Sequence, residues 1–227
     1  MVVVSHAHKF VFIKTMKTGG TAIETCLSNI LPETDILSPI FPKEDGHKAR
    51  NYKNNKGVFY NHMSAKEVIK ILGNSSKDYF FWCVEREPID KCLSKYAMLK
   101  NSPNHNKGKD SLTWDNFVEK GKFPVNTGQY FSCPRKLSLK KKILVKQILD
   151  YKNIRNTLPI FLKDKFGIEG FNLNKSNAKG NYRTSDIPKI DEVNQVQKEM
   201  IYKKFKISNR ILKEFGIDYD TKYFNHS

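Results

Sequence analysis

A strand-like apolar run followed by two glycines and an amphipathic segment constrains the fold of this chain most. Phe10–Ile13 is continuously apolar, which predicts a short buried strand. The polar stretch "KTMKTGGT" (Lys14–Thr21) follows, and apolar residues then recur at helical spacing: Ala22, Ile23, Cys26, Leu27, Ile30 and Leu31. Such a strand-to-helix turn points free backbone N–H groups and the positive end of the helix dipole at the loop. The sequence therefore predicts a loop that binds an anion, most often a phosphate.

The loop differs from the usual nucleotide-triphosphate loop. In G-x-x-x-x-G-K-[ST] the lysine follows the last glycine, whereas here Lys17 precedes Gly19 and Gly20. The alternative is a glycine-rich turn with an incidental lysine. A second signal is needed to decide between them.

Length and composition favour one globular domain over residues 1–227. The chain is long enough for one substantial core, and no Gly/Ser/Pro-rich linker or internal repeat divides it. No stretch approaches the ~20 apolar residues of a membrane span. Met1–Ser5 is too short for the core of a signal peptide. These observations predict a cytoplasmic protein.

The cysteines and the charge limit the classes of ligand. Cys26, Cys83, Cys92 and Cys133 form no C-x-x-C pair, so we expect buried thiols, no metal site and no disulfide. The formal net charge of +17 favours an acidic partner such as a nucleotide cofactor, a polyanionic substrate or nucleic acid. The alternative is that the charge reflects a general excess of lysine on solvated faces. The sequence contains no basic stripe with interleaved aromatic residues, the pattern that would indicate nucleic-acid binding.

Strand and helix signals alternate along the rest of the chain. Strands are predicted at Tyr79–Val84 and Ile143–Leu149. Helices are predicted after the capping box Ser64/Glu67, after Pro88 to about Lys100, over 112–121, over 154–166 and over about 191–215, while 32–57 and 101–109 are polar loops. This alternation predicts an α/β domain with a mainly parallel sheet flanked by helices. Ligands of such sheets bind at the carboxyl ends of the strands, so the first turn and the end of Tyr79–Val84 are expected on one rim.

The second signal follows that strand. In "CVEREPIDKCLSKY", Arg86 at the strand end precedes Ser94 on the next helix by eight residues. This pattern resembles the 3′-phosphate motif of sulfotransferases that use 3′-phosphoadenosine 5′-phosphosulfate (PAPS), and "KTMKTGGT" resembles the 5′-phosphosulfate loop of the same family. The resemblance implies the P-loop NTPase-like sulfotransferase fold.

Further segments resemble the carbohydrate type of this family and extend the likeness over most of residues 9–216. They are "NHMSAKEV", with a histidine ahead of a helix, "LDYKNI" at a strand end, and the Asn-x-Ser loop in "FNLNKSNAKG". The chain departs from the family pattern at Lys14, Glu85 and Lys152. These departures bear on the type of substrate more than on the cofactor.

The resemblance implies a division of the cofactor between two sets of residues. The 5′-phosphosulfate would be bound by Lys17, Thr18, Gly19, Gly20, Thr21 and Ala22, through one ammonium, hydroxyls and backbone donors. Arg86 would grip the 3′-phosphate with its planar fork and Ser94 would add a hydroxyl. The alternatives are an ion pair of Arg86 with Glu85 or Glu87, and an ordinary serine on a helix surface.

The predicted reaction is transfer of the sulfuryl group of PAPS to an acceptor hydroxyl, without a metal. Lys17 is the candidate for stabilising charge on the bridging oxygen and His62 the candidate base, with Glu24 and Glu85 as rivals. The alternative for His62 is capping or packing at the start of its helix. Rival functions are an ATP-dependent phosphotransferase and a non-catalytic protein that binds polyanions or nucleic acid.

The acceptor is expected to be a carbohydrate hydroxyl rather than a phenol, and nucleic acid is not expected as a partner. The two polar loops contain many basic residues that could wall an open acceptor cleft, whereas a phenol or steroid needs a closed apolar pocket. These residues are His47, Lys48, Arg50, Lys53, Lys56, His105, Lys107 and Lys109.

Overall fold

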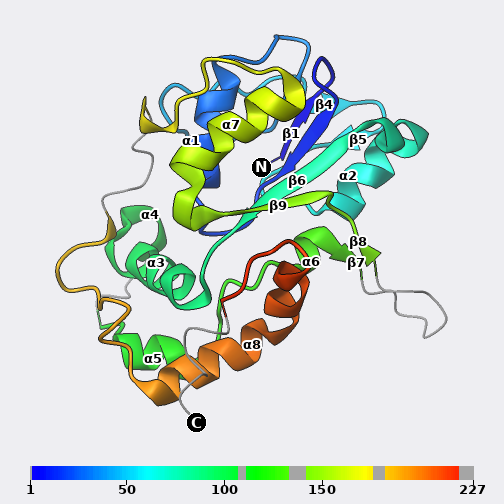
Figure 1. The fold of residues 1–227 in the computed structure, drawn as a ribbon. Coiled ribbons are helices and arrows are strands. Elements are labelled where there is room, and N and C mark those ends of the chain that lie inside the picture. The colour runs from blue at the N-terminus through cyan, green and yellow to red at the C-terminus, as the bar shows by residue number, and fades with distance from the viewer. Residues whose placement is uncertain (1, 107–110, 133–141, 176–181, 220–227) are drawn as a thin grey trace. The chain divides into compact units, whose positions relative to one another are not determined.

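The structure, a computed structural model, describes residues 2–106, 111–132, 142–175 and 182–219 (Figure 1). The chain divides into two compact units. Unit 1 comprises Met1–Glu85 and Asn126–Ala178, and unit 2 comprises Arg86–Val125 and Lys179–Ser227. The single domain predicted over residues 1–227 stays a prediction. Cys133, Lys107, Lys109 and Ser176 of the Asn-x-Ser loop lie outside the described residues.

A five-stranded sheet with the order β3-β1-β2-β6-β9 forms the centre of unit 1. Its strands are β1 (Val2–Ser5), β2 (Phe10–Ile13), β3 (Ile36–Leu37), β6 (Phe80–Glu85) and β9 (Gln147–Asp150). Strand β6 runs parallel to both of its neighbours, β2 and β9, whereas β1 pairs antiparallel with β2 and β3. The α/β class is therefore confirmed, but the sheet is mixed rather than mainly parallel.

The two antiparallel strands explain this correction. Val2, Val3 and Val4 are fully buried, and the short connection from Ser5 to Phe10 allows only an antiparallel pair. Strand β3 lies inside the segment predicted as a polar surface loop, where Ile36 and Leu37 pair with Val4 and Val3. Two apolar residues give too weak a periodic signal to predict a strand.

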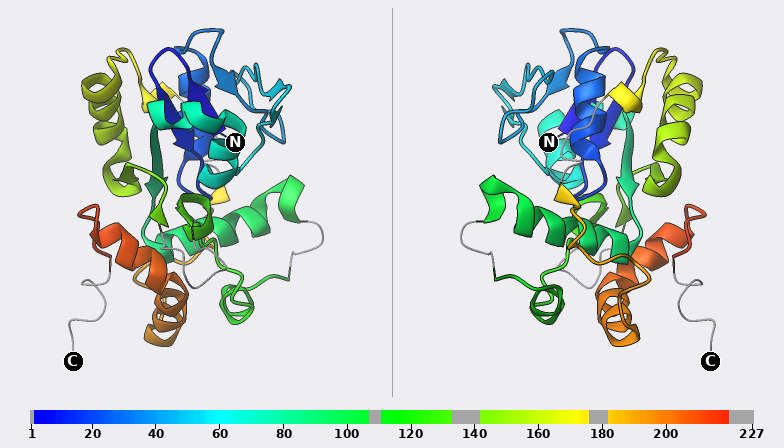
Figure 2. Two further views of the ribbon diagram at one scale, coloured as in Figure 1. Left: turned by 90° about the vertical axis from the view of Figure 1, so that its right-hand side faces the viewer. Right: turned by 90° about the vertical axis from the view of Figure 1, so that its left-hand side faces the viewer.

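Helices cover the sheet, and β1 and β2 are buried along their whole length. Helices α1 (Gly20–Ser28) and α7 (Ile154–Phe166) pack with the 3₁₀ turn η3 (Leu173–Lys175) in one core cluster, to which the fully buried Trp82 also belongs. The Trp82 and Phe12 rings lie 4.4 Å apart between centroids. Helix α2 (Ala65–Leu72) lies on the other side of β6 from α7 (Figure 2).

Helix ends follow the predicted signals closely. Ser64 and Glu67 form the predicted capping box of α2, and Gly73 ends that helix. Gly167 ends α7 in the left-handed conformation.

The predicted strand Ile143–Leu149 is instead split between β8 and β9. The remaining short elements of unit 1 are β4 (Lys53–Asn54), β5 (Gly57–Val58), η1 (Gly73–Asp78), α6 (Thr127–Tyr130), β7 (Phe131–Ser132), β8 (Lys142–Ile143) and η2 (Tyr151–Asn153).

Unit 2 is helical. It contains α3 (Pro88–Asn101), α4 (Pro103–Asn106), α5 (Trp114–Glu119) and α8 (Gln195–Lys213). The Tyr96, Trp114 and Phe117 rings pack together, and the indole N–H of Trp114 donates to Gln197 Oε1 at 3.0 Å, which ties α5 to α8. Across all the described residues, no helix has both the length and the apolar character that crossing a membrane requires.

Candidate functional site

In the loop between β2 and α1, the backbone dihedral φ alternates between positive and negative values. Lys17 has a φ of 62° and Gly19 a φ of 71°, while Thr18 between them and Gly20 after them have negative φ. Backbone that alternates in this way turns successive N–H groups toward one centre and forms an anion-binding concavity. A positive φ is uncommon at a lysine and costs conformational energy, so the surrounding structure must hold this loop.

The loop lies beside the carboxyl end of β6, as predicted. The Thr15 hydroxyl donates to the carbonyl oxygen of Val84, the last but one residue of β6. The Thr18 hydroxyl donates to the Thr15 carbonyl at 3.1 Å, and Thr18 is fully buried. The Thr18 side chain therefore braces the loop, and its backbone N–H is the group that suits the predicted contact with an anion.

The two glycines make room for side chains of this same unit. A Cβ atom at Gly20 would lie 2.5 Å from Lys14 Cγ, and one at Gly19 would lie 2.9 Å from Tyr151 Cε2. Gly19 also needs glycine for its left-handed conformation. Tyr151 belongs to the "LDYKNI" segment, so the structure brings this segment and the "KTMKTGGT" loop together within unit 1.

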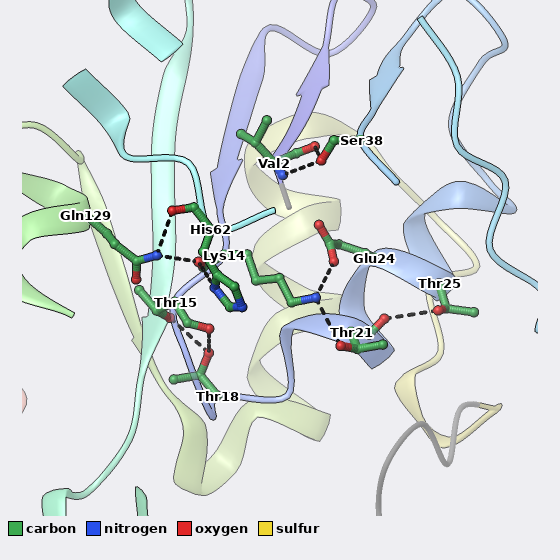
Figure 3. A network of polar contacts seen from close by, with 10 residues as sticks. All are labelled: Val2, Lys14, Thr15, Thr18, Thr21, Glu24, Thr25, Ser38, His62 and Gln129. Atoms are coloured by element: carbon green, nitrogen blue, oxygen red, sulfur yellow. Dashed lines mark hydrogen bonds and ion pairs between the residues drawn. The ribbon is translucent and has the colours of Figure 1, made fainter. Parts of the chain in front are cut away.

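Lys14 forms a buried ion pair beneath the loop. Its Nζ lies 2.9 Å from Glu24 Oε2 and donates to Thr21 Oγ1 at 3.0 Å, as Figure 3 shows. The two charged side chains are 6% and 0% exposed, so each compensates a charge that would be costly to bury alone. Glu24 thus has a structural partner, which weakens it as a rival for the base. In the sequence, Lys14 stands out only as a departure from the family pattern.

His62 lies against the first residue of the loop. Its Nδ1 is 3.2 Å from the Lys14 carbonyl oxygen (Figure 3), and its φ is 59°. A carbonyl oxygen only accepts, so Nδ1 carries the proton and the lone pair of the neutral ring is on Nε2. The capping of α2 is done by Ser64 and Glu67 rather than by His62. The structure therefore brings His62 to the predicted anion loop.

Two amide side chains that sequence analysis missed also contact this loop. Asn126 bonds both backbone groups of Met16, and Gln129 donates to the carbonyl oxygens of Lys14 and His62. No local sequence signal marks either residue, because each acts on backbone groups far away in the chain.

Arg86 and Ser94 belong to unit 2, where Arg86 takes part in a cluster around Asp90. Arg86 Nε donates to Asp90 Oδ2, and Arg183 Nη2 donates to Asp90 Oδ1 and, at 2.7 Å, to the Asp90 carbonyl. Burial opposes ionisation of Asp90, but the hydrogen bonds and charges of the two guanidinium groups outweigh it and lower its pKa. Ser94 follows Asp90 by one helical turn and lies half-buried on the same face of α3.

The glutamates around Arg86 have other positions. Glu85 is buried at the end of β6, opposite Asp150 of β9. Glu87 caps α3 by accepting from the N–H groups of Ile89 and Asp90, and the Tyr202 hydroxyl donates to it at 2.6 Å. Burial raises the pKa of Glu87 and outweighs these hydrogen bonds, which lower it. The structure pairs Arg86 with Asp90.

The basic loop of unit 1 is partly structural. Arg50 donates to the carbonyl oxygens of Ser28 and Leu31 at 3.1 and 2.7 Å, so it binds the carboxyl end of α1. Burial, and then the charges of Lys14 and Arg50, lower the pKa of His47 to about 4. His47 is therefore neutral at pH 7, and it adds no charge to the predicted acceptor cleft.

The described cysteines and acidic residues offer no metal centre. In the part of the chain that the structure describes, no group of three or more His, Cys, Asp or Glu side chains is placed to hold a metal ion. Burial raises the pKa of the Cys92 thiol well above its usual value, so that thiol stays protonated.

Comparison of the chain with family models, with curated proteins and with solved structures finds no match.

Proposed function

We propose that this chain is a PAPS-dependent sulfotransferase whose β2–α1 loop binds the 5′-phosphosulfate. The alternation of φ from Lys17 to Gly20 carries the proposal, because it supplies converging backbone donors where the sequence predicts an anion. Thr21 and Ala22 extend these donors into the first turn of α1, whose N–H groups have no acceptor within the helix. The family resemblance alone assigns Arg86 and Ser94 of unit 2 to the 3′-phosphate.

The residues of the loop fit a phosphosulfate group. The loop combines an ammonium at Lys17 with main-chain N–H groups, and the structure gives its first helical turn no acidic residue. Both features favour a negative charge at this helix terminus. When bound, PAPS supplies the activated sulfuryl group.

The chain's own residues divide the work around the acceptor. Lys17 and the N–H groups of the loop would hold the phosphosulfate, which would supply the sulfuryl group to the acceptor oxygen, and His62 Nε2 would take the proton of the acceptor hydroxyl. That nitrogen is the basic one because Nδ1 donates to the Lys14 carbonyl. The Lys17 ammonium stabilises the negative charge that develops on the bridging oxygen.

The proposed acceptor is a hydroxyl group of a carbohydrate. Exposed lysines in the basic loop of unit 1, Lys48, Lys53 and Lys56, support an anionic or polar acceptor more than an apolar one. Screening of acceptors with labelled PAPS is the direct way to identify it.

Binding of adenosine 3′,5′-bisphosphate (PAP) tests the function. We expect PAP to raise the melting temperature in the presence of EDTA, since a ligand that binds the native state stabilises it. Lys17→Ala should reduce this shift, whereas Lys66→Ala, which removes an exposed lysine from α2, should leave it unchanged.

Other ligands separate this function from its rivals. A shift with ATP and magnesium but none with millimolar PAP would support the phosphotransferase instead. Stabilisation by any polyanion, with equal response in the Lys17 and Lys66 variants, would support a non-catalytic polyanion-binding protein.

A further inference from the structure

Asn126 and Gln129 form an arrangement that we call the amide clamp. Asn126 is 1% exposed, and its Oδ1 accepts from the Met16 N–H at 3.0 Å while its Nδ2 donates to the Met16 carbonyl at 3.2 Å. One side chain thus satisfies both backbone groups of a loop residue. This contact holds the peptide directly before Lys17.

Gln129 contacts the loop two residues before Met16, at Lys14, and it also contacts His62. Its Nε2 donates to the carbonyl oxygens of Lys14 and His62, each at 3.1 Å (Figure 3). Rotating the amide by 180° would place Oε1 against two carbonyl oxygens, so these contacts fix its orientation. Gln129 therefore holds the backbone of His62 against the backbone of Lys14.

The same Lys14 carbonyl receives the ring of His62. It accepts from Gln129 Nε2 and from His62 Nδ1, which uses both of its lone pairs. His62 reaches this position with a φ of 59°, a conformation that is uncommon outside glycine and that the surrounding contacts help to maintain. The two carbonyl contacts of Gln129 are placed to maintain it.

We propose that Gln129 is a positioning residue that fixes the ring orientation and the Nδ1–H tautomer of His62. Asn126 is the corresponding positioning residue for the anion loop. The catalytic part of this inference rests on the proposed function, in which His62 Nε2 accepts the proton. The tautomer itself is a property of the chain without cofactor.

Nuclear magnetic resonance of the histidine ring nitrogens tests the tautomer directly. The His62 signals are identified by their loss in His62→Ala. We expect the neutral ring to carry its proton on Nδ1 in the wild type, and the Nε2–H form to increase in Gln129→Met, which keeps the side-chain volume and removes the donors. A wild-type ring protonated on Nε2 would overturn the proposal without any Gln129 variant.

Gln147→Met is the matched control. Gln147 is also a half-buried glutamine of unit 1, and its Nε2 donates to one backbone carbonyl, that of Ile148, at 3.0 Å. It lies at the start of β9, at the opposite end from Tyr151. This variant should keep the wild-type tautomer. An equal change in both variants, or none in Gln129→Met, would contradict a positioning role.

Turnover and PAP binding separate the two arms of the clamp. Gln129→Met should lower kcat by about 10–100-fold, the usual loss when a residue that orients a functional group is removed, with little change in PAP affinity. Asn126→Ala should instead weaken PAP binding. If the wild type binds no PAP while the tautomer still changes in Gln129→Met, the proposed function fails and the positioning role stands.

Discussion

The β2–α1 loop of unit 1 and the start of α3 in unit 2 are both predicted to bind phosphate groups, but the first offers backbone N–H groups and the second offers charged side chains. The loop presents backbone N–H groups, and three uncharged side chains hold its backbone through buried or part-buried hydrogen bonds, those of Thr15, Asn126 and Gln129. The start of α3 consists of two arginine side chains on one carboxylate, that of Asp90. Of these, the Arg183 side chain is 41% exposed.

This difference predicts different behaviour. Backbone donors are fixed by the fold and carry no net charge, so salt screens them little, whereas partly exposed charges are screened over about 8–10 Å at physiological ionic strength. We therefore expect the loop to respond to changes in shape and the cluster around Asp90 to respond to changes in charge and salt.

The largest expected effect is on turnover when the base is removed from the loop. His62→Ala should lower kcat by ~10²–10⁴-fold and leave PAP affinity nearly unchanged, because the ring takes a proton and binds no phosphate. His8→Ala is the matched control, since His8 Nδ1 also contacts a backbone carbonyl, that of Phe166, at 3.0 Å. Steady-state kinetics and calorimetry measure both. Full activity of the His62 variant would show that another group, such as Glu85, is the general base.

A smaller effect is expected from removing charge from the cluster around Asp90. Arg86→Ala should weaken PAP binding by about 10–100-fold, because a charge-assisted hydrogen bond to the phosphate is lost. The remaining affinity should depend less on salt than that of the wild type. Titration calorimetry at low and high salt measures both quantities.

The control for Arg86 lies in the same unit. Arg210→Ala removes an equal charge from the exposed face of α8 and should leave PAP affinity unchanged. Equal losses in the two variants would show that net charge, rather than a defined site, attracts PAP.

The smallest expected effect concerns the shape of the loop. Gly20→Ala should destabilise the protein by about 1–3 kcal/mol, because the new Cβ would overlap the buried stem of Lys14. Gly128→Ala is the control, since a Cβ there meets nothing within 4 Å. Thermal unfolding compares the two. Equal stability of both variants would show that Lys14 can move aside and that the loop is less rigid than we infer.

Much of the candidate site was predictable because its signals are local. The strand, the loop and the helix from Phe10 to Ser28 follow from apolar spacing and paired glycines. The capping box at Ser64 and the stop at Gly73 follow from side chains that bond their own backbone neighbours. The position of His62 at the loop was expected from the family resemblance, and its role as base stays a prediction.

Other features depend on partners far along the chain and were not predictable. Arg50 was expected to wall an acceptor cleft, yet it binds the end of α1, because its guanidinium finds the carbonyl groups of Ser28 and Leu31. The sequence offered Glu85 and Glu87 as ion-pair partners of Arg86, whereas the structure pairs Arg86 with Asp90, four residues later.

The sequence by itself determined the α/β class, the order of the main elements and the position of the glycine-rich β2–α1 loop, because these depend on periodicity and turn chemistry within a few residues. Only the tertiary structure decided that β1 and β3 make the sheet mixed, that Lys14 turns inward to Glu24, and that the amide clamp holds the loop. Asn126 bonds Met16 across 110 residues of chain. Such a contact leaves no periodic trace in the sequence, because a side-chain amide bonds whichever backbone groups the folded chain brings within reach.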